Sequence, residues 1–99
     1  MHRLTVLYRP PVDPEHFREY YVNTHLPLAA KLPGLIHSDY SLDVAGLGDE
    51  SPYFAVFHGD FESAQAMVAA LGSAAGTAVA GDVPNYATGG VEMIHYPLA

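Results

Sequence analysis

The sequence has no cysteine and no tryptophan among its 99 residues. Without cysteine the chain forms no disulfide, thiolate zinc site, iron–sulfur cluster or thiol nucleophile. It also lacks an apolar run near the ~20 residues that a membrane-spanning helix needs. Its first residues show no basic leader followed by an apolar segment and a cleavage site. We therefore expect a cytoplasmic protein without a membrane partner.

Basic residues are also scarce. Four Lys and Arg stand against eleven Asp and Glu, which gives a net charge of −7. Nucleic-acid binding is not expected, because phosphate contacts require clustered Lys and Arg. With 49% hydrophobic and 15% charged residues, the chain is too apolar to be disordered. Its length predicts one domain over residues 1–99 with a single core.

What the sequence does contain is six His, seven Tyr and four strand-like segments. β-Branched and aromatic residues predict strands over residues 3–9, 35–44, 53–58 and 91–96. The second of these alternates between polar and apolar residues, which is typical of an edge strand. The first and third are apolar on both faces, which is typical of central strands.

Two helical regions separate these strands. Asp13 and Pro14 predict an N-cap and a first helical turn, and Pro33 follows the end of that helix. Pro27 is expected to strain the helix near its end. Either Asp60 or Ser63 can cap the second region. We expect helices over residues 14–32 and from 60 or 63 to 71, a short helical piece over 74–80, and loops over 46–52 and 82–90.

The resulting β-α-β-β-α-β order predicts an α+β, ferredoxin-like fold with a four-stranded antiparallel sheet and both helices on one face. Because two helices cover only one face, the two-sided apolar strands should expose a continuous aromatic patch on the other. We expect that patch to close against a second copy. The product would be a homodimeric α/β barrel with a cavity in each half.

His25 is the most informative candidate for chemistry. It follows Tyr21 by four residues on the shoulder of the apolar helix stripe, and Pro27 opens the next turn. An imidazole placed there can exchange a proton near neutral pH. The alternative is a structural histidine at a helix end, bonded to a carbonyl or stabilised by the helix dipole.

Aromatic side chains could form the wall of a binding cavity. On the apolar face of the second strand, Tyr40 could hydrogen-bond an enol or carbonyl oxygen beside Ser38. The alternative for Tyr40 is ordinary core packing. A flat apolar ligand would be lined by a further set of residues. These candidate substrate-binding residues are Tyr8, Tyr21, Ser38, Tyr53, Phe57 and Tyr86.

Other polar residues give no motif. His37, Asp39 and Asp43 share one face of the second strand, but solvated side chains explain them better than a metal site. No His-x-x-x-His, His-x-His or His–Asp pair with ligand spacing is found. The segments Gly46-x-Gly48 and Gly89-Gly90 both precede strands, so neither offers a helix N-terminus to a phosphate. We expect no metal and no bound cofactor.

Five segments give the chain a resemblance to a known family. The strongest is Phe17-x-x-Tyr20-Tyr21-x-x-x-His25-x-Pro27-Leu28 on the first helix. The others are Leu7-Tyr8-Arg9-Pro10, Lys31-Leu32-Pro33-Gly34-Leu35, Phe61-Glu62-Ser63 and Asp82-Val83-Pro84-Asn85-Tyr86. In these, and over nearly its whole length, the chain resembles the EthD family of small dimeric α/β-barrel proteins.

The resemblance implies a ferredoxin-like α+β dimer. It also implies membership of a group often labelled reductases or oxidoreductases, although no cofactor defines it. Relatives with this barrel include lactone isomerases, polyketide cyclases and cofactor-free monooxygenases of aromatic polyketides. There, a histidine in the position of His25 works at the mouth of the cavity, often beside a strand residue facing as Ser38 and Tyr40 do. The chain has no counterpart of the thiol that some relatives use, and Tyr86 replaces the family's Phe.

Two functions remain open. In the first, His25 removes a proton alpha to a carbonyl, or from a phenol, of an apolar aromatic or polyketide-like molecule, and Tyr40 binds the resulting oxyanion. Isomerisation, cyclisation, dehydration or oxygenation would all follow from that step. In the second, the protein is a non-catalytic dimer that carries a hydrophobic metabolite or assists its degradation. An oxidoreductase is a further alternative.

Overall fold

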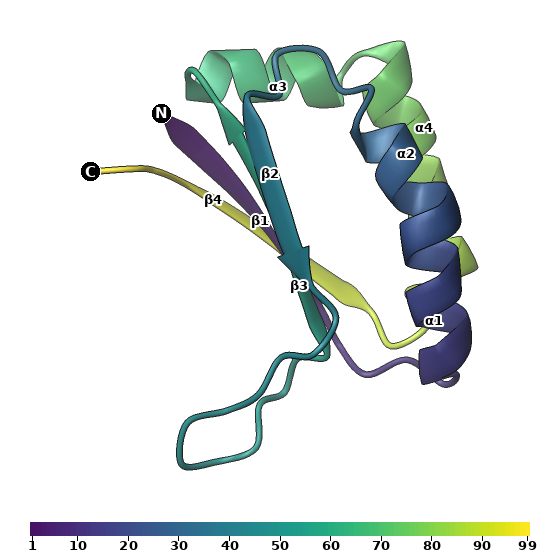
Figure 1. The fold of residues 1–99 in the computed structure, drawn as a ribbon. Coiled ribbons are helices and arrows are strands. Elements are labelled where there is room, and N and C mark those ends of the chain that lie inside the picture. The colour runs from purple at the N-terminus through teal and green to yellow at the C-terminus, as the bar shows by residue number, and fades with distance from the viewer.

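The computed structural model describes all residues 1–99 and has the expected βαββαβ order. Its four strands are β1 (His2–Tyr8), β2 (His37–Ser41), β3 (Ala55–Phe61) and β4 (Val91–Pro97). They form one antiparallel sheet in the order β2-β3-β1-β4. All helices lie on one face of this sheet, and the other face is open (Figure 1). The ferredoxin-like α+β prediction is confirmed, as is the edge position of β2.

The first helical region is one continuous rod with an irregular middle. It consists of α1 (Pro14–Tyr20), a π-helical turn η1 (Tyr21–His25) and α2 (Leu26–Ala29). The Asp13 side chain caps it by accepting a hydrogen bond from the His16 amide. The π turn closes when the Leu26 amide bonds to the Tyr21 carbonyl, one residue further back than in an α-helix. Pro27 has no amide hydrogen to donate, which favours this looser turn just before it.

The second helical region consists of α3 (Ala64–Leu71), α4 (Ala74–Asp82) and a single 3-10 turn, η2 (Val83–Asn85). Ser63 is the cap that bonds the Ala66 amide, not Asp60. Asp60 instead belongs to β3, where it pairs with Arg3. Helix α4 continues past residue 80, and the segment predicted to be a loop from residue 82 begins with the last residue of α4, followed by η2. Asp82 therefore ends a helix and is buried.

The strand boundaries also differ from the sequence prediction. Strand β2 is shorter than residues 35–44, and β3 starts two residues later and ends three residues later than 53–58. Alternation fails before β3. Phe54 packs edge-on against Phe17 under the helices, whereas the Tyr53 hydroxyl bonds to Glu92. The expected grouping of Tyr53 with Ala55 and Phe57 is thus reversed.

Aromatic rings fill the space between the sheet and the helices. The largest fully buried side chains are Tyr8, Tyr21, Tyr86, Phe17 and Phe61. The first four of these rings pack against one another mostly edge to face, an arrangement that aromatic rings prefer over face-to-face stacking. These rings form the centre of a single core of thirteen buried apolar residues.

The open sheet face is less apolar than predicted. It carries the Arg3–Asp60 ion pair and a Thr5–Tyr96 hydrogen bond, around the smaller apolar side chains of Leu7, Val56 and Ile94. The aromatic residues of β1 and β3 point instead toward the helices, since they occupy the alternate positions, and Tyr96 of β4 is the aromatic residue that the strands place on the open face. The predicted continuous aromatic patch on this face is therefore wrong.

No single helix is long and apolar enough to cross a membrane. The helices Ala64–Leu71 and Ala74–Asn85 reach that length and composition only as a pair, and they meet at 72°.

Candidate functional site

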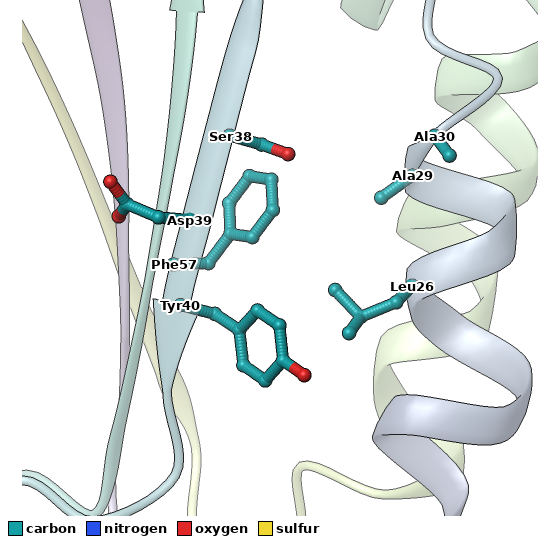
Figure 2. Close-up of a pocket in the computed structure, with 7 residues that line it drawn as sticks. All are labelled: Leu26, Ala29, Ala30, Ser38, Asp39, Tyr40 and Phe57. Atoms are coloured by element: carbon teal, nitrogen blue, oxygen red, sulfur yellow. The ribbon is translucent and has the colours of Figure 1, made fainter.

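A groove opens between the edge strand β2 and helix α2. Its volume is about 450 Å³. Leu26, Ala29 and Ala30 form the helix wall, and Figure 2 shows Tyr40 and Phe57 projecting toward them from the sheet. Ser38 and Asp39 complete the lining on β2. Strand β2 lies at the edge of the sheet, and Tyr40 on it is 45% exposed.

A second, more enclosed cavity of about 180 Å³ lies deeper between the sheet and the helices. Ala29 and Phe57 line both spaces and therefore lie between the groove and the inner cavity. His25 and the Tyr8 ring are its aromatic polar groups; the remaining lining is almost entirely aliphatic. The inner cavity is thus a mostly apolar space with one imidazole in its wall.

His25 is held in one orientation by a carboxylate. Its side chain is buried, at the end of the π turn, and its Nδ1 lies 3.0 Å from Asp82 Oδ2. The imidazole stacks on the Tyr21 ring, with centroids 5.3 Å apart, and packs against Tyr86 at 4.7 Å. Since a carboxylate accepts hydrogen bonds, it stabilises the tautomer with hydrogen on Nδ1. The lone pair of Nε2, which makes no hydrogen bond within the chain, is then free to accept a proton.

Asp82 is itself fixed by further donors. The Tyr20 hydroxyl bonds to its Oδ1, and the Asn85 amide donates to the same oxygen at 3.0 Å. Tyr20 comes from α1, Asp82 from the end of α4 and Asn85 from η2. The carboxylate thus joins the two helical regions, and its partners position it against His25.

Burial and hydrogen bonding set the charges of this pair. Burial lowers the pKa of His25 below its ordinary value, and the bond to Asp82 opposes this only in part. Burial tends to raise the pKa of Asp82, but hydrogen bonds from Tyr20, Asn85 and His25 together lower it below its usual range. Near neutral pH the site therefore contains a neutral imidazole next to a carboxylate, the protonation states that a general base requires.

Three phenols lie beside the imidazole. The hydroxyls of Tyr8 and Tyr86 are 2.8 Å apart, and the hydroxyl of Tyr21 is buried without any hydrogen-bond partner. Burial raises the pKa of all three phenols. They consequently remain protonated and can serve as hydrogen-bond donors.

The structure brings together most of the residues selected from the sequence. His25, Tyr8, Tyr21, Tyr86 and Phe57 are neighbours in or beside the inner cavity. Ser38 and Tyr40 line the outer groove, and the Tyr40 ring lies 5.8 Å from that of Tyr21. Tyr53 lies apart from them: its hydroxyl bonds to Glu92 and its ring lies under the Arg9 guanidinium.

Sequence reasoning missed Asp82 and the two residues that hold it. Asp82 lies 57 positions from His25, so no local spacing reveals the pair. The signal available was an acid next to Pro84 and Asn85 in a segment that resembles the family. Placing that acid as the first residue of a loop hid its burial.

The remaining histidines make local contacts elsewhere. His2 bonds to His95 across β1 and β4, His37 and His58 both lie against Asp39, and His16 contacts the Asn85 carbonyl. Of the six, His25 alone is paired with a carboxylate at the inner cavity.

The model of the EthD domain family matches residues 9–90 of this chain. A curated relative is an uncharacterised 11.0 kDa protein from the thcB–thcC intergenic region of Rhodococcus erythropolis. It is 33% identical over 94 residues, which cover 95% of this chain and 91% of that protein.

Solved structures share the fold. An ethyl tert-butyl ether D (EthD) family protein of Bacillus halodurans superposes with a TM-score of 0.92 at 26% identity, over 100% of this chain and 99% of that one. A ferredoxin-like protein of unknown function from Thermobifida fusca, described as dimeric, has a TM-score of 0.75 at 15% identity, over 98% and 90% of the two chains.

Proposed function

The chain belongs to the EthD domain family, and on that premise we propose that it is a small enzyme that removes a proton from an apolar, carbonyl-bearing molecule. The single observation that carries the proposal is the buried His25–Asp82 pair beside the inner cavity, with Nε2 unbonded. Aspartate orientation of a neutral imidazole is the arrangement by which proteins make histidine a general base.

The substrate class follows from the cavity. Its lining is almost wholly apolar, so a ligand gains by burying hydrocarbon or aromatic surface and loses by burying charge. Together the groove and the cavity accept a ring system with one or a few oxygens, such as an aromatic or polyketide-like compound. Tyr40 and Ser38 supply polar groups at the mouth.

In the proposed reaction, Nε2 of His25 accepts a proton, either from the substrate carbon alpha to the carbonyl or from a phenol hydroxyl of the substrate. The electron pair moves onto the substrate oxygen, and the resulting imidazolium is stabilised by Asp82. Tyr40 would hydrogen-bond that oxygen from the groove. Isomerisation, cyclisation or oxygenation begins from the anion. The proton transfer itself requires neither a nucleotide nor a metal.

We also propose that two copies close their open sheet faces against each other. The support is the solvated apolar group of Leu7, Val56 and Ile94 on that face, together with the dimeric description of the Thermobifida protein. The candidate site lies on the opposite, helix-covered side of the sheet in each copy.

Deuterium exchange of 2-tetralone, an aromatic ketone with acidic alpha hydrogens, tests the reaction. In D2O we expect the protein to accelerate exchange, and His25→Ala to reduce the acceleration by about 10²–10⁴-fold, the usual contribution of a general base. Tyr96→Phe, which removes a phenol from the open face, is the matched control. Binding of the ketone without any acceleration of exchange would indicate a carrier rather than an enzyme. Mass spectrometry of co-purified ligand would then identify the natural molecule.

A further inference from the structure

Tyr8, Tyr21 and Tyr86, here called the phenol cluster, are buried phenols whose O–H groups do not all find a hydrogen-bond acceptor. The three rings pack together with centroids 5.4–5.6 Å apart. A single hydrogen bond connects their hydroxyls, between Tyr8 and Tyr86, and it uses one O–H group. The Tyr21 O–H has no partner. Two of the three O–H groups therefore have no acceptor within the chain.

Leaving a buried hydroxyl without a partner is unfavourable, and folded proteins usually avoid it. The nearby carboxylate of Asp82 does not relieve the deficit, since its bonds go to Tyr20, Asn85 and His25. An acceptor supplied by a bound molecule would relieve it.

The place of the cluster specifies where that acceptor would bind. Tyr8 lines the inner cavity, and the Tyr21 ring packs against both Tyr8, at 5.6 Å, and Tyr40 of the outer groove, at 5.8 Å between ring centroids. His25, stacked on Tyr21, faces the same cavity. The unused donors and the unused base are thus adjacent.

We propose that the phenol cluster binds an oxyanion, and that the ligand is an apolar molecule with an ionisable enol or phenol whose oxygen accepts a hydrogen bond from Tyr21. This inference rests on the proposed function and specifies its substrate class. A proton passes from the ligand oxygen or alpha carbon to Nε2 of His25, which leaves a negative oxygen that accepts hydrogen bonds from Tyr21 and Tyr8 in addition to the bond proposed for Tyr40. The charges then alternate as oxyanion, imidazolium and Asp82 carboxylate. Hydrogen bonds to a charged oxygen are about twice as strong as neutral ones, which favours the anion over the neutral ligand.

Titration with 4-nitrophenol tests the proposal, because this phenol ionises near neutral pH and absorbs visible light only as the anion. We expect the protein at slightly acidic pH to bind it with growth of the phenolate band, and to bind 4-nitroanisole, which cannot ionise, without that preference. Tyr21→Phe should weaken 4-nitrophenol binding about tenfold and reduce the phenolate fraction, while leaving 4-nitroanisole unchanged. Tyr96→Phe is the matched loss of a phenol from the open face.

Equal 4-nitrophenol affinity and band growth in wild type and Tyr21→Phe would overturn the proposal, as would the absence of any phenolate preference in the wild type. Tyr8→Phe, read in the same titration, is a second variant that should show the same loss, and circular dichroism establishes that each variant is folded.

The two proposals fail separately. If His25→Ala loses ketone exchange while Tyr21→Phe binds 4-nitrophenol as the wild type does, His25 is supported as the base and the oxyanion site is overturned. If the phenolate band depends on Tyr21 but the protein does not accelerate ketone exchange, the oxyanion site is supported and the general base is overturned.

Discussion

At the scale of single residues, two opposing effects set the pKa of His25, namely burial and the Asp82 carboxylate. Burial disfavours the imidazolium and Asp82 favours it, with burial the larger effect. Sequence position predicted that His25 would be the histidine of interest, because its helical spacing from Tyr21 is a local property. The role of Asp82 was not predictable in the same way, because Asp82 and His25 come together only when the two helical regions pack against each other.

The lowered pKa of His25 has a consequence for stability. The unfolded chain binds a proton at the ordinary histidine pKa, and the folded chain only at a lower pH. This contribution is therefore fully present above the ordinary value and is lost as pH falls through the folded one, with a slope of at most about 1.4 kcal/mol per pH unit. Urea unfolding between pH 7 and 5 should show this fall in wild type and a shallower one in His25→Gln. Parallel curves for the two proteins would contradict the assignment.

Removal of the Tyr21 hydroxyl is expected to increase the stability of the folded protein. Tyr21→Phe removes a buried hydroxyl that has no partner and keeps the ring, so the unliganded protein should gain about 1 kcal/mol in free energy of unfolding. The control is Tyr8→Phe, which breaks the bond to Tyr86 and should not stabilise. Urea denaturation measures both, and a destabilised Tyr21→Phe would show that the hydroxyl has a partner.

At the scale of elements, the sequence predicted the helix caps and helix ends. It did not always predict on which face of the sheet a side chain lies. Asp13 and Ser63 cap helices as their residue types indicate. The π turn was visible only as strain at Pro27. Tyr53 and Phe54 exchange faces because the chain is irregular before β3, and no alternation pattern shows where regular pairing starts.

Helix α4 contains two glycines, and replacing each by alanine is expected to change stability in opposite directions. A Cβ on Gly76 would lie 2.3 Å from the Leu71 carbonyl oxygen, whereas one on Gly81 would meet nothing within 4 Å. Gly76→Ala must separate α3 from α4 and should cost about 1–3 kcal/mol. Gly81→Ala should add about 0.5–1 kcal/mol, because alanine favours the helix. Thermal unfolding of the two variants compares them directly, and equal effects would contradict the close approach at Gly76.

At the scale of the whole molecule, the element order alone predicted the topology, because βαββαβ connections with both helices on one face leave few arrangements. The character of the open face was mispredicted. Apolar residues on both sides of β1 and β3 implied aromatic exposure, but the rings point to the helices, and ion pairs and hydrogen bonds occupy much of the other face.

The proposed dimer depends on that face. Light scattering at micromolar concentration should give twice the 10.6 kDa mass of the chain. Ile94→Asp places a charge among the apolar side chains that would meet the second copy, and it should yield the monomer mass with an unchanged circular dichroism spectrum. Val68→Asp, on the exposed side of α3, is the matched control. A wild-type monomer would contradict the proposed assembly.

The most direct test of the central claim is the protonation state of His25, read from the nitrogen shifts of its ring by NMR across pH 4 to 9. At pH 7 we expect a neutral ring with hydrogen on Nδ1. The pKa should lie below the ordinary histidine value, and lower still in Asp82→Asn, because that variant removes the carboxylate that favours the charged form. Addition of 4-nitrophenol should raise the pKa as the oxyanion stabilises the imidazolium. An imidazole with hydrogen on Nε2, or a pKa that ignores both Asp82 and the ligand, would contradict the assignment of His25 as the base.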